Sequence, residues 1–132
     1  MSAEENQELI HRLFAEGFNQ GNLAVVDSVF DPHFVDRSTP DQNPGIQGVK
    51  DYIAMLRIGF PDLNVTIEDL VAIGDKVAVR TTWRGTHQGI YEGIPPTGKH
   101  ATRTMIQIFR VSAGKLIEEW SEGEGLRQQL LP

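Results

Sequence analysis

The 132-residue sequence contains no cysteine, which excludes disulfide bonds and metal sites built on thiolates. It also has no run of basic residues, and its net charge of −6 argues against binding to the phosphates of nucleic acids. The acidic N-terminus lacks the apolar core of a signal peptide, and no stretch approaches the roughly 18 apolar residues of a membrane span. We therefore expect a cytoplasmic protein that binds neither nucleic acid nor membranes.

Metal ligands are also scarce. The four histidines, His11, His33, His87 and His100, lack the close spacing of a ligand set. The length of the chain suits one domain over residues 1–132, and 13 glycines with 7 prolines favour a loop-rich α+β domain over a helix bundle. We expect neither a metal ion nor an organic cofactor.

The first half of the chain has the periodicity of helices. Ser2 followed by Glu5 has the spacing of a capping box, in which each side chain caps the backbone N–H of the other residue. Apolar residues then recur every three or four positions, as they do on the buried face of a helix. The predicted elements are a helix from Ser2 to about Gly21, a helix capped by Asn22 and ended by Asp31-Pro32, a short strand or extended arm over residues 34–38, and a helix from Val49 to about Gly59.

The second half alternates apolar and polar residues with a period of two, which predicts strands. Two hairpins are expected: residues 63–73 and 76–86 joined at Gly74-Asp75, and residues 102–122 joined at Ser112-Ala113-Gly114. This order predicts an α+β fold, in which three N-terminal helices pack on a strongly curved, mainly antiparallel sheet. A cavity between helices and such a sheet is a usual place for a small-molecule site.

The closing hairpin carries the candidate site on one face. Alternation places four residues of its first strand on that face: Arg103, Met105, Gln107 and Phe109. A two-residue loop at the turn sets Glu122 opposite Met105. The same register sets Trp120 opposite Gln107. Arg103 and Gln107 are then both diagonal to Glu122, at roughly 7 to 8 Å between Cβ atoms, within reach of one small ligand.

Glu122 is the candidate general acid or base, because partial burial on this face is the kind of environment in which carboxyl groups transfer protons. The alternative is an ordinary solvated glutamate at a strand end, and Glu124 has the same strand parity. Gln107 either satisfies buried backbone groups or donates a hydrogen bond to a substrate oxygen. Arg103 either pairs with Glu122 or binds an anionic or carbonyl group of a ligand.

Several segments of the chain resemble one protein family. They are HQGIYEGIPPTGK at residues 87–99, IFRV at 108–111, GKLI at 114–117, Glu119-Trp120 and Gln129-Leu130. On these segments the chain resembles the SnoaL-like polyketide cyclase (ester cyclase) family of the nuclear transport factor 2-like superfamily. The resemblance implies a cone-shaped, cystatin-like α+β half-barrel with an internal cavity. It also implies a homodimer that forms through the sheet.

The resemblance further implies a reaction and its residues. Characterised cyclases of the family close an aromatic polyketide ester by a cofactor-free intramolecular aldol reaction. Their acid/base carboxylate, two residues after a tryptophan, falls on Glu122. Their active-site histidine falls on Gln107, which cannot exchange a proton near neutral pH. Their asparagine at the end of the first short strand falls on Asp36.

Three further residues complete the predicted site. His87, at a strand-to-loop junction, is either catalytic at the cavity rim or hydrogen-bonded within the loop. Trp83 and Tyr52 either belong to the core or line a pocket for a flat apolar ligand. The expected catalytic residues are Glu122, Gln107, His87 and Asp36, and the expected substrate-binding residues are Arg103, Met105, Trp120, Phe109, Trp83 and Tyr52.

The function expected from these residues is that of a cofactor-independent cyclase, isomerase or dehydratase, which uses a carboxylate on a polyketide-like, small apolar or aromatic carbonyl substrate. The alternative is a non-catalytic module of the same fold that binds a small hydrophobic ligand or dimerises. A third interpretation is water activation, as in limonene epoxide hydrolase. It requires an Asp-Arg-Asp group, of which Asp69 opposite Arg80 supplies only part.

Overall fold

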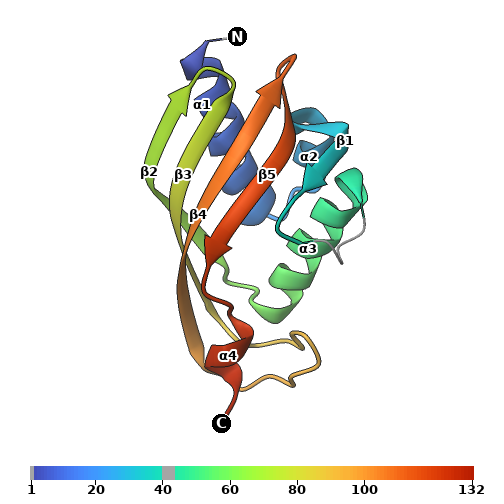
Figure 1. Cartoon of the computed structure of the whole chain (residues 1–132). Coiled ribbons are helices and arrows are strands. Elements are labelled where there is room, and N and C mark those ends of the chain that lie inside the picture. Colours follow the sequence, from blue (N-terminus) through green and yellow to red (C-terminus); the bar gives the residue numbers. More distant parts are fainter. Residues whose placement is uncertain (1, 40–43) are drawn as a thin grey trace.

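Helices cover one side of a single curved sheet (Figure 1). The computed structural model describes residues 2–39 and 44–132. The strand order is β1-β5-β4-β3-β2, the sheet does not close into a barrel, and the N-terminal helices pack against its inner face. The predicted α+β fold is therefore confirmed. In these described parts of the chain, no helix is long and apolar enough to cross a membrane.

The N-terminal helices begin where the sequence predicts, to within a residue or a turn. The Ser2 hydroxyl accepts from the Glu5 N–H at 3.0 Å, and the Glu5 carboxylate accepts from the Ser2 N–H at 3.3 Å, which confirms the capping box. Asn22 accepts from the Ala24 N–H, although the second helix begins one residue later than expected. The helices are α1 (Ala3–Arg12), its π-helical continuation η1 (Leu13–Phe18), α2 (Ala24–Val29), α3 (Gly45–Gly59) and α4 (Arg127–Leu130).

Both predicted hairpins are present, and a fifth strand joins them. The strands are β1 (Phe30–Asp36), β2 (Asn64–Ile73), β3 (Lys76–Thr86), β4 (His100–Ser112) and β5 (Lys115–Gly123). β2 to β5 are antiparallel, whereas β1 runs parallel to β5. Ala113 and Gly114 form the predicted two-residue loop, with φ values of 50° and 76°, because tight hairpin turns require positive φ at both positions.

Each hairpin contains a β-bulge, which the predicted registers do not include. The extra residue is Glu68 in β2 and Ile117 in β5. The predicted pairing holds near each turn and is displaced by one residue beyond the bulge. Glu122 therefore lies opposite Ile106 instead of Met105. Because a shift of one residue reverses the two faces of a strand, the predicted inner face is right for β4 and wrong for β5.

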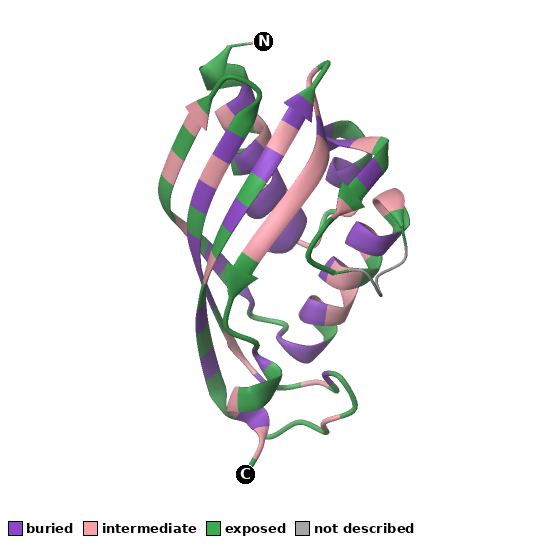
Figure 2. Cartoon of the chain, viewed as in Figure 1, coloured by how far each residue is buried: buried purple, intermediate pink, exposed green. Residues whose placement is uncertain are grey.

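The core between sheet and helices is built around Trp83. Its ring meets Phe14 edge-on at 5.9 Å between centroids and Phe18 at 4.9 Å. Figure 2 shows buried and exposed residues alternating along β3 and β4, as expected for a sheet with one covered face. The other face carries exposed apolar side chains, among them Ile106 (55% exposed) and Ile108 (38% exposed).

The connection between β3 and β4, residues 87–99, is organised by His87 and Gly89. His87 is fully buried, its Nδ1 accepts from the Thr97 N–H at 3.2 Å, and its ring lies 5.7 Å from the ring of Phe60. A Cβ atom on Gly89 would overlap the carbonyl oxygen of Ile58, so that only glycine fits there. These contacts match the interpretation of His87 as a residue hydrogen-bonded within the loop.

Candidate functional site

A cavity of about 310 Å³ lies between the helices and the inner face of the sheet. This volume is at the lower end of the range of about 300 to 1,000 Å³ for small-molecule sites. Seven of the residues expected at the site line it: Asp36, Tyr52, Trp83, Arg103, Met105, Gln107 and Phe109. Glu119, Ser121 and Tyr91 line it as well and were not expected there.

Glu119 is a carboxyl group that the bulge at Ile117 turns into the cavity. It lies opposite Phe109 of β4 and Asp36 of β1, and Gln107 Nε2 donates a hydrogen bond to its Oε2 at 2.7 Å. Burial raises the pKa of the Glu119 carboxyl from 4.5 to about 8, and the negative charge of Asp36 adds to the increase. The hydrogen bond from Gln107 opposes it by stabilising the carboxylate. Glu119 is therefore mostly protonated at neutral pH.

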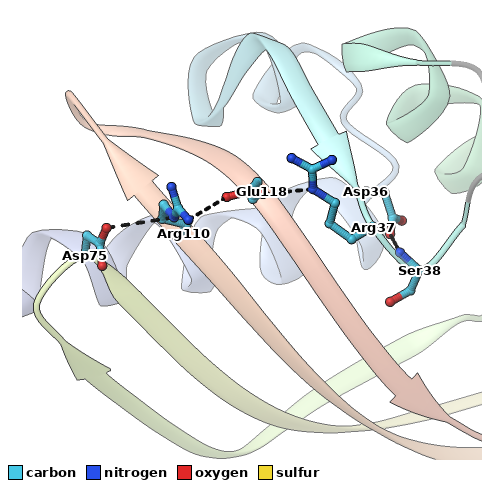
Figure 3. Close-up of polar contacts among 6 residues, drawn as sticks. All are labelled: Asp36, Arg37, Ser38, Asp75, Arg110 and Glu118. Atoms are coloured by element: carbon cyan, nitrogen blue, oxygen red, sulfur yellow. Dashed lines mark hydrogen bonds and ion pairs between the residues drawn. The ribbon is translucent and has the colours of Figure 1, made fainter.

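A chain of ion pairs on the outer side of β5 supports this orientation (Figure 3). Glu118 pairs with Arg37 at 2.8 Å and with Arg110 at 3.1 Å. Arg110 in turn lies 3.9 Å from Asp75, in the turn between β2 and β3. Since neighbouring residues of a strand point to opposite faces, these partners of Glu118 favour the inward orientation of Glu119.

Asp36 and Gln107 complete a polar group at one end of the cavity, and we call Glu119, Gln107 and Asp36 the acid end. Asp36 accepts from the Ser38 N–H at 2.9 Å, and the Ser38 hydroxyl accepts from the Ser121 N–H at 2.9 Å, which joins the end of β1 to β5. Gln107 is buried, and its Oε1 has no hydrogen-bond partner among the described residues. A buried amide oxygen of this kind can accept a hydrogen bond from a ligand.

Arg103, Tyr52 and Trp83 form a second polar group, which we call the arginine end. Arg103 is only 6% exposed; its Nη2 donates to the Tyr52 hydroxyl at 2.6 Å, and its guanidinium carbon lies 4.3 Å from the centroid of the Trp83 ring. Within residues 2–39 and 44–132, its Nε has no hydrogen-bond partner and no carboxylate forms an ion pair with it. A cation over an aromatic ring is stabilised by about 0.5 to 2 kcal/mol, less than the several kcal/mol that burial of an ion costs.

The two ends of the cavity are separated along β4. Arg103 and Gln107 are four residues apart in that strand. At about 3.3 Å per residue, this corresponds to roughly 13 Å of strand. Arg103 therefore does not lie beside Glu119, and a ligand that contacts both ends has to be elongated.

Two expected site residues lie outside the cavity because of the bulge. Glu122 is exposed on the outer face opposite Ile106, and Trp120 is half-buried on that same face. The alternative in which Arg103 pairs with Glu122 is therefore wrong. Glu124, the alternative carboxylate, is exposed and lines the cavity.

Two residues of the β3–β4 connection differ in their relation to the cavity. His87 is not among the described residues that line it. Tyr91 does line it, against Phe60 at 5.2 Å between ring centroids. Burial raises the pKa of the Tyr91 phenol, and the nearby Arg103 charge opposes this shift. Tyr91 is therefore a neutral hydroxyl in the cavity wall, near the arginine end.

Comparison with known proteins identifies relatives along nearly the whole chain. Residues 8–130 match the family model of the SnoaL-like polyketide cyclases. A search of curated proteins gave no match.

Several solved structures are similar. TsrD from Streptomyces laurentii is 29% identical with a TM-score of 0.90, over 98% of this chain and 97% of that chain. AclR from Streptomyces galilaeus, a proposed hydroxylase, is 27% identical with a TM-score of 0.84, over 99% and 100% of the two chains. IdmH from Streptomyces antibioticus, a proposed polyketide cyclase, is 30% identical with a TM-score of 0.78, over 95% and 97%.

Proposed function

The chain belongs to the SnoaL-like polyketide cyclase family, and we propose that it is a cofactor-independent enzyme that transfers a proton next to a carbonyl group of a small aromatic or polyketide-like substrate. The observation that carries this proposal is the Glu119 carboxyl in the cavity wall, with its pKa raised to about 8. A general acid or base is most effective when its pKa lies near the working pH. Glu119 takes the acid/base role that the resemblance had given to Glu122.

In the proposed reaction, the ionised form of Glu119 removes a proton from the carbon next to the substrate carbonyl. With a pKa of about 8, about one molecule in ten carries this form at pH 7. The electron pair of the C–H bond forms an enolate, which attacks a second carbonyl of the same substrate. The new alkoxide oxygen then receives the proton back from Glu119, so that the carboxylate is regenerated.

Gln107 is a positioning residue in this mechanism. Its Nε2–H holds the Glu119 carboxyl and stabilises the carboxylate when it forms. Its Oε1 is available to an enol or hydroxyl group of the substrate. A positioned acid/base supplies about 10² to 10⁴ in rate, and orientation within the cavity has to provide the rest.

Hydrogen exchange at carbon tests the proposal without knowledge of the natural substrate. The methyl hydrogens of 2-acetylnaphthalene, a flat aryl ketone, exchange with D₂O through the enolate, and NMR follows the exchange. We expect the wild-type protein to accelerate exchange and Glu119→Gln to lose about 10² to 10⁴ of that acceleration. Glu122→Gln is the matched control and should retain full activity, because its carboxyl is exposed on the other face. Equal exchange by wild type and Glu119→Gln would contradict the proposal.

A non-catalytic binding module of the same fold is the second candidate. Gln107 favours it, because this position carries an amide where the resembling cyclases carry a titrating histidine. The same experiment separates the two candidates. A binding module holds 2-acetylnaphthalene and gives no acceleration of exchange above the Glu119→Gln background.

We also propose that two copies pair through the outer face of the sheet. Ile106 and Ile108 are exposed there beside the half-buried Trp120, and burial of such apolar surface favours association. We expect sedimentation to show a dimer that Ile106→Asp converts to a monomer. Ile58→Asp is the control, since Ile58 is 62% exposed but lies on α3. A monomeric wild type, or a dimer that survives Ile106→Asp, would exclude this interface.

A further inference from the structure

We propose that the arginine end of the cavity binds a carboxylate of the substrate, so that the enzyme takes an elongated aromatic acid whose reacting carbonyl lies at the acid end. This inference rests on the proposed function and specifies its substrate class. It gives Arg103 a role in anchoring the substrate, distant from the atoms that react.

The bonding of Arg103 is incomplete within the protein. A guanidinium group has five N–H donors in a planar fork that matches the two oxygens of a carboxylate. Nη2 donates to the Tyr52 hydroxyl at 2.6 Å, whereas Nε has no partner in the part of the chain that the structure describes. Arg103 is 6% exposed, so bulk water has little access to it. A ligand carboxylate would accept hydrogen bonds from the unpartnered guanidinium N–H groups and would place a negative charge beside the arginine.

The charges on the cavity wall favour an anion at this end. Arg103 is the only buried cation among the described residues that line the cavity, because Arg127 is exposed. Glu92 and Glu124 also line the cavity but are exposed, where water screens their charges. The remaining acids, Asp36 and Glu119, belong to the acid end.

The surroundings of Arg103 fix its orientation. The guanidinium carbon lies over the Trp83 ring and the Tyr52 hydroxyl accepts a hydrogen bond from one of the nitrogens, so the group is ordered before a ligand arrives. Order of this kind reduces the entropy lost on binding. Because Arg103 and Gln107 are separated by roughly 13 Å of strand, one carboxylate cannot occupy both ends. The carboxylate and the reacting carbonyl therefore lie at opposite ends of the ligand.

Binding of three probe acids and their amides tests the inference. The acids are benzoate, 2-naphthoate and anthracene-2-carboxylate, and each is compared with its primary amide by isothermal titration calorimetry. We expect at least one acid to bind wild-type protein about 10- to 100-fold more tightly than its amide, because hydrogen bonds between charged groups are stronger than those to a neutral amide. If no acid binds more tightly than its amide, including the case in which none binds, the inference is wrong.

Substitutions assign the preference to Arg103. Arg103→Met should abolish it, whereas Arg103→Lys should keep part of it, because lysine retains the charge without the fork. Arg84→Met is the matched control, since Arg84 is exposed on the neighbouring strand β3. An acid preference that survives Arg103→Met overturns the inference. The comparison within the wild-type protein decides the question even if Arg103→Met does not fold.

Failure of this inference can be distinguished from failure of the proposed function. The Glu119→Gln variant should keep the acid preference, because Glu119 belongs to the other end of the cavity. If the wild type shows an acid preference and Glu119→Gln exchanges hydrogen at the normal rate, only the proton-transfer role of Glu119 is refuted. Loss of exchange in Glu119→Gln without any acid preference in the wild type would refute the anchoring role alone.

Discussion

The raised pKa of Glu119 should make the stability of the protein depend on pH in a way that one substitution removes. In the unfolded chain the carboxyl titrates near 4.5, and in the folded protein near 8. A group whose folded pKa is raised contributes stability that is fully present below the unfolded pKa and is lost as pH rises through the folded pKa. The loss therefore begins near pH 4.5 and is complete somewhat above pH 8.

The size of this loss follows from the two pKa values. A shift from 4.5 to about 8 corresponds to about 5 kcal/mol over the whole titration. Between pH 5 and pH 9, about 4 kcal/mol of this is lost. Most single domains have a free energy of unfolding of only about 5 to 15 kcal/mol, so the effect is large enough to measure.

Urea unfolding followed by tryptophan fluorescence measures the effect directly. The free energy of unfolding of wild type and Glu119→Gln is compared at pH 5, 7 and 9. Glutamine keeps the size of the side chain and cannot ionise, and the contributions of titrating groups that do not interact with Glu119 cancel in the difference between the two proteins. We expect this difference to change by about 4 kcal/mol between pH 5 and pH 9. Glu122→Gln should show no such change, and a constant difference for Glu119→Gln would refute the burial argument.

Two further predictions concern the partners of the site. Gln107→Leu removes the hydrogen bond that stabilises the Glu119 carboxylate, so the pKa of Glu119 should rise further. The pH–rate profile of hydrogen exchange should then move to higher pH. An unchanged profile would show that Gln107 does not hold the carboxylate. Gly89→Ala should cost about 1 to 3 kcal/mol in thermal unfolding, because its Cβ would overlap the Ile58 carbonyl, whereas Gly125→Ala, with open space around it, should cost little.

Local signals in the sequence were sufficient to predict most of the helices and strands and the fold class. The capping box at Ser2, the helical periodicity, the period-two strands and the turn at Ala113-Gly114 all depend on residues close together in the chain. Their order, helices before antiparallel strands, limits the architecture to a small number of layer arrangements. The face of β4 that carries Arg103 and Gln107 was predicted correctly for the same reason.

The acid/base carboxyl could not be located from the sequence because it depends on one bulge. The residues Glu118 and Glu119 are adjacent, and an unbroken register would place Glu118 opposite Phe109. With Ile117 as the extra residue, Glu119 takes that position. No glycine or proline marks the bulge. What distinguishes the two registers is long-range, namely the pairing of β1 with β5 and the ion pairs of Glu118 with Arg37 and other residues.

The role of His87 in the β3–β4 connection also could not be predicted from the sequence. A histidine in a motif rich in glycine and proline is compatible with catalysis or with structure, and only packing decides between them. Burial of His87 against Phe60 and its hydrogen bond from Thr97 place it in the loop framework. Tyr91, four residues later, contributes to the cavity instead.

Glu119 is proposed to transfer protons because its carboxyl lies in the cavity wall with a raised pKa, and a carboxyl NMR titration measures that pKa without reference to any substrate. In protein labelled with ¹³C at the glutamate side-chain carboxyls, the Glu119 resonance is identified by its absence from the spectrum of Glu119→Gln. We expect this resonance to titrate with a pKa of about 8. A titration near 4.5, the value of an ordinary glutamate, would contradict it.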